Sequence, residues 1–272
     1  MNLIGHHLCA SAAGRSYRLG AVLPDLLGLY RRRVRPRALA KLWEANPQPE
    51  GQPQPEGRPP FSPTVSELLG GMDFHHVVDM HFHRAPLFTE VSGDLRRALL
   101  RASDTPGLKR FLPAHVLTEL LLDHLAMARD PDAADRFHLD LVEGADDMKA
   151  LVVAHPLAEE ESFATFMARV LDDRFVEDYR TVEGILGRMN RILLRFGQRP
   201  LETSEQRAVE ETFAEASSTM ERRLADFIAA MADLVDSKEA SMAKMAKALS
   251  SEAPGTPDRK GRPAPGLAVQ PV

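Results

Sequence analysis

The chain has 272 residues, a formal net charge of −5, and 44% hydrophobic and 27% charged residues, which are proportions typical of a globular protein with a sizeable core. Only 6% of the residues are aromatic, and the abundance of Ala, Leu and Met favours helix over strand. The negative charge argues against non-specific nucleic-acid binding, and no apolar run approaches the roughly 20 residues that cross a membrane. With a single cysteine, Cys9, and a start unlike a secretory signal, we expect a cytoplasmic location.

Two short helices are predicted at the start of the chain, over residues 2–13 and 16–30, with a break near Gly14. Five arginines follow them within seven positions, at Arg31, Arg32, Arg33, Arg35 and Arg37. Because a guanidinium is not discharged at any physiological pH, these residues form a fixed positive patch. The patch is either a partner-binding surface or an ordinary solvated loop.

The next part of the chain begins with a proline-rich stretch, residues 46–63, in which Gln-Pro-Glu-Gly occurs twice. Proline at this density excludes helix and central strand, so the stretch is predicted to be a surface insert. A helix is then predicted over residues 64–84, with Thr64 or Ser66 as its N-cap. Further helices are predicted over residues 88–102 and 113–128.

The C-terminal part is also predicted to be helical. Residues 159–196 are predicted to form two helices, with a break near Asp172–Arg174. Thr203 followed by Gln206 has the spacing of a capping box, which predicts the start of a long amphipathic helix over about 204–249.

Residues 251–272 are rich in Pro, Gly and Ala and are predicted to be a disordered tail. No segment of the chain alternates apolar and polar residues as a half-buried strand does. The sequence therefore predicts an all-α protein, with one helical-bundle domain over residues 1–250.

Histidine and acidic residues form two runs that step by four residues. The runs are His75, Asp79 and His83, and His115, Glu119 and Asp123. Four residues advance a helix slightly beyond one turn, so each run lies along one helix face. The second run lies in a segment that otherwise resembles buried core, where ionisable groups are costly without a partner such as a metal ion. The alternative is a narrow solvated stripe on a partly exposed helix.

Two further ionisable residues, His6 and Asp25, lie among apolar neighbours in the two N-terminal helices. Either one alone reads as a helix cap or as a satisfied core group. Beside the two runs, each becomes a candidate for the same site.

These segments resemble motifs of the acyl carrier protein phosphodiesterase family. The matching motifs are Asn2–His6 with Ala10, Gly20–Asp25, Gly71–Asp79 with the later Pro86, and Val116–Leu125. The chain differs from the family pattern at Asp73, His76, His83 and Glu119. The resemblance covers most of residues 1–236 apart from the proline-rich insert.

The resemblance implies an HD-like helical phosphohydrolase fold with a divalent metal, Mn²⁺ or Mg²⁺. It implies hydrolysis of the phosphodiester that joins 4′-phosphopantetheine to a serine of acyl carrier protein, and a role in fatty-acid or polyketide metabolism. The expected metal ligands are Asp25, His75, Asp79 and Asp123. The expected catalytic or supporting residues are His6, His115, Glu119 and His124.

The predicted function is therefore metal-dependent phosphodiester hydrolysis. Because acyl carrier proteins are acidic, the arginine patch is expected to attract this partner. A second hypothesis keeps the fold and the metal, but the substrate is a nucleotide or another small phosphoester. A third hypothesis is that the protein is an inactive helical scaffold, which binds a partner through its methionine-rich helix at 204–249. The periodic spacing of those methionines, however, favours a role in the core.

Overall fold

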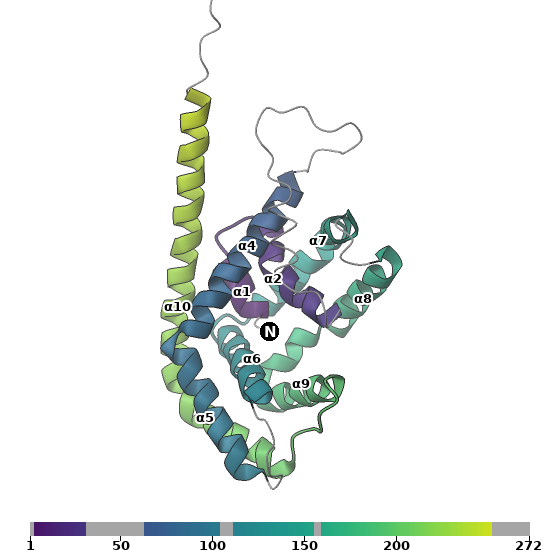
Figure 1. Cartoon of the computed structure of the whole chain (residues 1–272), viewed down its shortest axis with the longest axis vertical. Helices are drawn as coiled ribbons and strands as arrows, with labels where there is room; N and C mark the ends of the chain where they lie inside the picture. The colour runs from purple at the N-terminus through teal and green to yellow at the C-terminus, as the bar shows by residue number, and fades with distance from the viewer. Residues whose placement is uncertain (1–2, 31–62, 104–110, 155–158, 252–272) are drawn as a thin grey trace, which may run out of the picture. The chain divides into compact units, whose positions relative to one another are not determined.

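The computed structural model describes residues 3–30, 63–103, 111–154 and 159–251. These residues form helices and contain no strand, which confirms the all-α prediction. The elements, shown in Figure 1, are α1 (Leu3–Cys9), α2 (Arg15–Tyr30), α4 (Pro63–Arg84), α5 (Pro86–Ala102), α6 (Phe111–Arg129), α7 (Ala133–Ala154), α8 (Glu160–Asp173), the 3₁₀ helix η1 (Phe175–Arg180), α9 (Val182–Arg195) and α10 (Thr203–Ser251).

The chain divides into two compact units, Met1–Val235 and Asp236–Val272. Helix α10 runs across this division, and its last part is what the structure describes of the second unit. Arginines 31–37, residues 46–62 of the proline-rich insert and residues 252–272 lie outside the described part of the chain. None of the described helices has an apolar stretch sufficient to cross a membrane.

The predicted N-terminal helices are present, with changed ends. Helix α1 stops at Cys9 rather than at residue 13, because the chain then turns through hydrogen bonds from Ser11 N–H to the Leu8 carbonyl and from Ala13 N–H to the Ala10 carbonyl. Helix α4 begins at Pro63, before either residue predicted to cap it.

The predicted break at residues 172–174 is confirmed, since Arg174 has a left-handed backbone with φ of 40° and separates α8 from η1. The predicted capping box of α10 was wrong. The buried Glu205 carboxylate accepts the Glu202 N–H at 2.9 Å, while the Gln206 amide donates to the Leu201 carbonyl at 2.8 Å. Glu205 therefore caps the helix one position earlier than expected.

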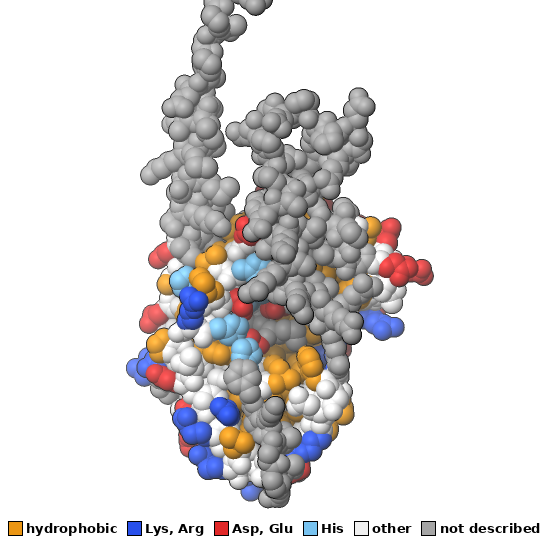
Figure 2. Space-filling model, in the orientation of Figure 1, with side chains coloured by type: hydrophobic (Ala, Val, Ile, Leu, Met, Phe, Trp, Pro, Cys, Tyr) orange, Lys and Arg blue, Asp and Glu red, His pale blue; other side chains and the backbone are white. Residues whose placement is uncertain are grey.

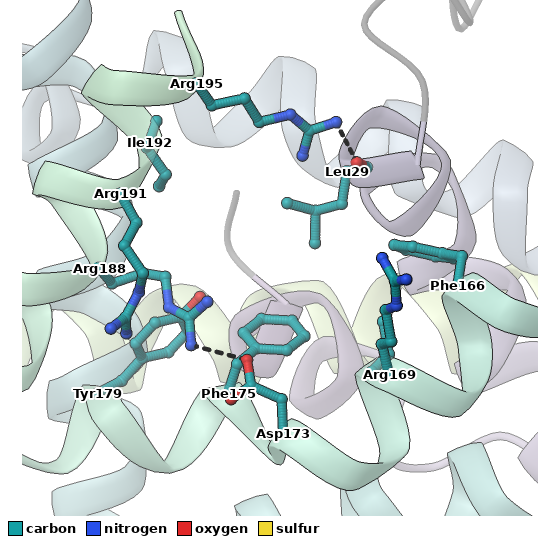
Figure 3. Close-up of a pocket in the computed structure, with 11 residues that line it drawn as sticks. Leu29, Phe166, Arg169, Asp173, Phe175, Tyr179, Arg188, Arg191, Ile192 and Arg195 are labelled. Atoms are coloured by element: carbon teal, nitrogen blue, oxygen red, sulfur yellow. Dashed lines mark hydrogen bonds and ion pairs between the residues drawn. The ribbon is translucent and has the colours of Figure 1, made fainter.

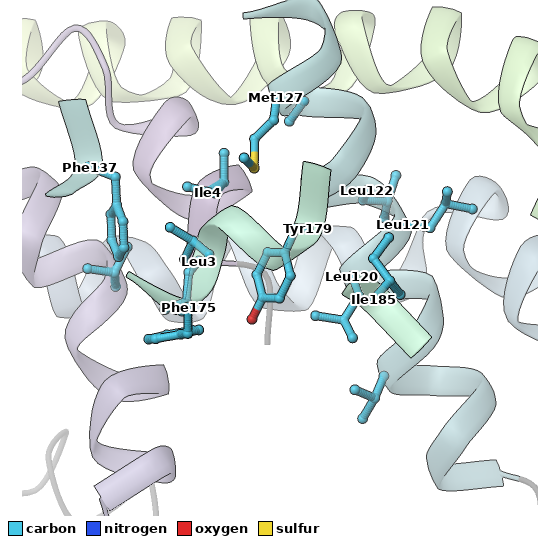
Figure 4. Close-up of a cluster of buried hydrophobic side chains, with 14 of the residues drawn as sticks. Leu3, Ile4, Leu120, Leu121, Leu122, Met127, Phe137, Phe175, Tyr179 and Ile185 are labelled. Atoms are coloured by element: carbon cyan, nitrogen blue, oxygen red, sulfur yellow. The ribbon is translucent and has the colours of Figure 1, made fainter. Parts of the chain in front are cut away.

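The core of the first unit surrounds α6, which contacts α1, α5, α7, α9 and η1. Figure 4 shows Leu120, Leu121 and Leu122 of α6 beside Tyr179 of η1 and Ile185 of α9. A helix that is apolar on nearly all sides is typically buried, as α6 is. The first part of α10 completes this core through Val209, Phe213, Met220 and Leu224.

Helices α2 and α4 pass each other at glycines. A Cβ atom on Gly20 would lie 2.1 Å from the Leu68 carbonyl oxygen, and one on Gly71 would lie 2.0 Å from the Tyr17 carbonyl oxygen. Only glycine permits such close approach of two backbones. The contact holds His75 of α4 against the backbone of α2 at Ala21.

Candidate metal centre

Three side chains that could hold a metal ion come together from three helices at the α2–α4 contact. They are His6 of α1, Asp25 of α2 and His75 of α4, whose ligand atoms all lie within 4.8 Å of one another. The two histidines are buried and their rings stack with centroids 4.2 Å apart. His6 Nδ1 lies 3.8 Å from Asp25 Oδ2, and the Asp25 side chain is 21% exposed. The set is therefore a largely enclosed group of two imidazoles and one carboxylate.

A backbone hydrogen bond decides which nitrogen carries the proton in the neutral form of the His75 ring. Its Nδ1 lies 2.9 Å from the Ala21 carbonyl oxygen, which accepts hydrogen bonds but cannot donate one. Nδ1 therefore carries the proton, and Nε2 keeps its lone pair in the neutral ring. Metal-binding histidines commonly have such a second partner, which orients the ring and raises its basicity.

A second set lies on α4 and α6 and consists of His83, His115 and Glu119. Glu119 Oε1 lies 3.1 Å from His83 Nε2 and 3.2 Å from His115 Nε2. The two rings stack with centroids 4.8 Å apart. Asp79, one turn before His83, places Oδ1 3.2 Å from His83 Nδ1 and so orients that ring. Figure 2 shows histidine and carboxylate side chains gathered on one part of the visible face.

Asp123 lies behind these sets, on the buried side of α6. Its Oδ1 accepts the Gly5 N–H at 2.9 Å, while Oδ2 is buried and accepts no hydrogen bond from the described residues. Burial raises the pKa of this carboxyl to about 7, despite the opposing effect of the Gly5 hydrogen bond. A buried carboxylate oxygen without a donor is suited to a cation or a proton as its partner.

The carboxyls of Asp25 and Asp79 are ionised at neutral pH. Burial favours a higher pKa for Asp25, but nearby positive charge, chiefly that of His75, outweighs it and lowers the pKa. Burial also favours a higher pKa for Asp79, but the hydrogen bond and charge of His83 bring it to about 2. These two side chains therefore present full negative charge to the centre.

The imidazole of His115 is neutral at the same pH. Burial and the neighbouring His83 lower the pKa of His115 to about 4. A neutral ring of this kind can bind a metal or accept a proton.

The structure groups the predicted residues differently from their spacing. Asp25 and His75 share one set with His6, whereas Asp79 and Asp123 are in neither set. His115 and Glu119 join His83, which its spacing had placed in the other run with His75 and Asp79. His124 Nδ1 donates to the Tyr179 carbonyl at 2.8 Å and is in neither set.

The donor chemistry fits a divalent transition metal. Each set combines two imidazole nitrogens with one carboxylate, so it is richer in nitrogen than the set expected from the sequence. Imidazole ligands suit Fe²⁺ and Zn²⁺, whereas Mg²⁺ and Mn²⁺ prefer oxygen ligands. The two nitrogen-rich sets therefore suit Fe²⁺ or Zn²⁺ better than the Mn²⁺ or Mg²⁺ that the motif resemblance implies.

Comparison of the chain with protein-family models, with curated proteins and with solved structures gave no match. Membership of the acyl carrier protein phosphodiesterase family accordingly stays a prediction from the sequence motifs. The chemistry of the site rests on the geometry of its side chains.

Proposed function

We propose that the protein is a metal-dependent phosphodiesterase whose substrate is the 4′-phosphopantetheine–serine linkage of holo acyl carrier protein. The convergence of His6, Asp25 and His75 from three helices supports this proposal most directly. Buried ionisable side chains brought together from distant parts of the chain are common at functional sites. The motif resemblance supplies the substrate.

A divalent cation at this centre supplies Lewis acidity, because it neutralises charge on phosphoryl oxygens and acidifies water. His6, Asp25 and His75 would hold it. Asp79 keeps the His83 ring in place through its hydrogen bond, and the Ala21 carbonyl does the same for His75.

His115 is suited to move the proton that hydrolysis requires. Water adds to phosphorus, the bond from phosphorus to the serine oxygen breaks, and one proton passes from the water to the serine alkoxide. The neutral His115 ring can accept that proton, and its conjugate acid, with a pKa of about 4, is acidic enough to deliver it to the alkoxide. Glu119, 3.2 Å away, stabilises the charged ring between the two transfers.

The arginine patch at Arg31–Arg37 is proposed to steer the acidic partner protein. It follows α2, which carries Asp25, and lies outside the described residues, so this role rests on charge and sequence position alone. Reversing the charge of Arg32 and Arg35 to Glu should raise KM for acyl carrier protein and reduce its salt dependence. Unchanged KM and salt dependence would contradict steering.

The test of the reaction is release of 4′-phosphopantetheine from holo acyl carrier protein with Mn²⁺, Fe²⁺ or Zn²⁺ and with EDTA. We expect metal-dependent release that falls by more than about 100-fold in Asp25→Asn and His75→Gln, because changes at residues that only support metal ligands already cost about 10- to 100-fold. His81→Gln is the matched control, since His81 lies on the same helix, is exposed and belongs to neither set.

Each other outcome has a defined meaning. Metal-dependent cleavage of bis-p-nitrophenyl phosphate, without release of 4′-phosphopantetheine from acyl carrier protein, would favour the hypothesis that the substrate is a small phosphoester. Absence of bound metal by elemental analysis, together with no turnover of either substrate, would refute the proposal and leave a helical scaffold.

A further inference from the structure

A cavity of about 220 Å³ lies apart from both metal-binding sets, between the C-terminal end of α2 and helices α8 and α9. Figure 3 shows Arg188, Arg191, Ile192 and Arg195 of α9 on one side and Arg169 with Phe166 of α8 opposite them. None of the residues lining it belongs to either set of metal-binding side chains.

The walls of this cavity are largely apolar. Leu29 comes from the last turn of α2, Phe166 and Val170 from α8, Phe175 from η1 and Ile192 from α9. An apolar cavity with a few converging polar groups is typical of a small-molecule site. The walls therefore suit the hydrocarbon part of a ligand.

Its charged residues are mainly arginines, four in number against the single carboxylate of Asp173. Arg188 bonds to Asp178 at 2.7 Å and to Asp173 at 3.3 Å, and Arg191 also bonds to Asp178. Those carboxylates neutralise much of the charge of this pair.

The charges of the other two arginines, Arg169 and Arg195, are not neutralised by a carboxylate of the described residues. Arg195 donates to the Leu29 carbonyl, a neutral acceptor, as Figure 3 shows. No salt bridge of the described residues involves Arg195 or Arg169. They come from different helices, so an anion between them would be held from both sides.

The inner wall of the cavity is closely packed. The Arg188 guanidinium lies over the Phe175 ring, 5.0 Å from its centroid, and its side chain is only 16% exposed. Tyr179 is fully buried, and its hydroxyl makes no hydrogen bond to a described residue. A wall already held by such contacts loses little conformational entropy when the body of a ligand packs against it.

We propose that this cavity binds a small anionic amphiphile, with a phosphate or carboxylate head between Arg169 and Arg195 and a short hydrocarbon body against Phe166 and Ile192. A larger cavity of about 600 Å³ shares Leu29, Phe166 and Arg169 and continues toward Glu159 and Glu161. Those carboxylates repel an anion. The head group therefore lies at the α9 end, and a neutral extension of the ligand would run toward α8.

The site does not depend on the proposed phosphodiesterase activity. None of the residues that line the cavity binds the metal in the proposed hydrolysis. Binding of the amphiphile can therefore be measured with EDTA present. Failure of the hydrolysis assay would leave this site untouched, and failure of binding would leave the metal centre untouched.

The experiment is isothermal titration of the full chain with n-hexyl phosphate and with n-hexanoate in EDTA, beside inorganic phosphate and n-hexanol. We expect one or both amphiphiles to bind at least about tenfold more tightly than inorganic phosphate or hexanol, because the cavity offers both charge and apolar surface. Preference for one amphiphile identifies the head group.

Variants locate the site. Arg169→Gln and Arg195→Gln should each weaken amphiphile binding by about tenfold through loss of a charge-assisted hydrogen bond. Both side chains are exposed, so thermal unfolding should be unchanged. Arg96→Gln, which changes an exposed arginine of α5, is the control and should bind as the wild type does.

Phe166→Ala should weaken the amphiphile but not inorganic phosphate. Wild-type affinity in both Arg169→Gln and Arg195→Gln would overturn the proposal. So would equal binding of inorganic phosphate and hexyl phosphate, or no binding of either amphiphile.

Discussion

Asp123 is the residue whose environment departs furthest from that of an ordinary carboxyl. It is fully buried, and its hydrogen bond to the Gly5 N–H does not offset the loss of solvation, so its pKa is raised from 3.8 to about 7. The folded state thus binds a proton that the unfolded state has released. Stability therefore falls as the pH rises from about 4 to 7, and Asn at this position removes the effect.

We predict that Asp123→Asn is more stable than the wild type at pH 8 in EDTA, by as much as about 4 kcal/mol, because the neutral amide replaces a buried charge. The difference should shrink to less than about 1 kcal/mol at pH 4. Urea unfolding of both proteins at the two pH values measures it. A difference that does not change with pH would contradict a raised pKa.

The candidate site shows what spacing along a helix can and cannot predict. The four-residue steps correctly placed His115 and Glu119 on one face, as their 3.2 Å contact shows. They could not show that Asp123, one turn later, turns into the core toward Gly5. Grouping His6 with His75 needs the tertiary fold, because the two lie on different helices and no local pattern links them.

The arginine-lined cavity was missed for the same reason. Arg188, Arg191 and Arg195 have the spacing of one helix face, and that signal was present in the sequence. Arg169 and the apolar wall come from other helices, so the sequence could not show that these arginines border a cavity rather than solvent.

Among the helices, α2 and α4 depend most on small residues. An added Cβ at Gly20 meets backbone of α4 at 2.1 Å, and backbone cannot move aside as a flexible side chain can. Gly28, on the exposed side of the same helix, has no atom within 4 Å of an added Cβ. The two glycines therefore provide a matched pair.

We predict that Gly20→Ala destabilises the protein by about 1–3 kcal/mol through forced separation of the two helices. Gly28→Ala should stabilise it by about 0.5–1 kcal/mol, because alanine favours helix. Thermal unfolding followed by circular dichroism compares them. A neutral Gly20→Ala would show that the helices can separate without cost.

Asp140 links its own helix, α7, to the two N-terminal helices α1 and α2. It bonds to His7 of α1 at 2.7 Å and to Arg18 of α2 at 2.7 and 3.0 Å. Burial favours a higher pKa, but these partners outweigh it and lower the pKa of Asp140 from 3.8 to about 2. A lowered pKa means that the unfolded state takes up the proton first, so the stabilisation is present above pH 4 and is lost as the pH falls to 2.

We predict that Asp140→Asn lowers the free energy of unfolding by about 2 kcal/mol at pH 7, and by much less near pH 2. Urea unfolding across this pH range tests it. Glu143→Gln is the control: Glu143 pairs with Arg15 at the surface, where both side chains are over 40% exposed, and its loss should cost less than about 1 kcal/mol. Equal effects of the two substitutions would contradict a special role for Asp140.

Helix positions were predictable wherever one face is clearly apolar. The predicted helices have counterparts in α2, α4, α5, α6, α8 and α9 within a few residues. Helix α7 was not predicted. Its buried Phe137 and Leu141 have helical spacing, but Leu139 and Val142 are about half exposed and place apolar residues on the opposite face, which obscures the pattern.

For the molecule as a whole, the first unit ends at Val235, within α10. Among the residues of α10 whose side chains the structure describes, the last fully buried core residues are Met220 and Leu224, and Phe227 and Ile228 pack against the same core. The described core contributions of α10 therefore precede Val235.

We predict that a chain ending at Val235 unfolds within about 2 °C of the full chain and keeps its metal affinity, because its core is intact. A chain ending at Glu210 loses Phe213 and Met220 and should be much less stable. Thermal unfolding and metal titration compare the three chains. A large loss of stability on ending at Val235 would contradict an independent first unit.

Helix α1 has only seven residues, all of them buried, and carries one of the candidate metal ligands. Isolated helices shorter than about 12–15 residues are marginal in water, so α1 exists through its contacts with α2, α4, α6 and α7. A cation shared by His6, Asp25 and His75 would act as a clip between α1 and two much longer helices. The amide hydrogens of α1 should then exchange with solvent far more slowly when the ion is bound, so that this short helix reports on occupancy of the centre.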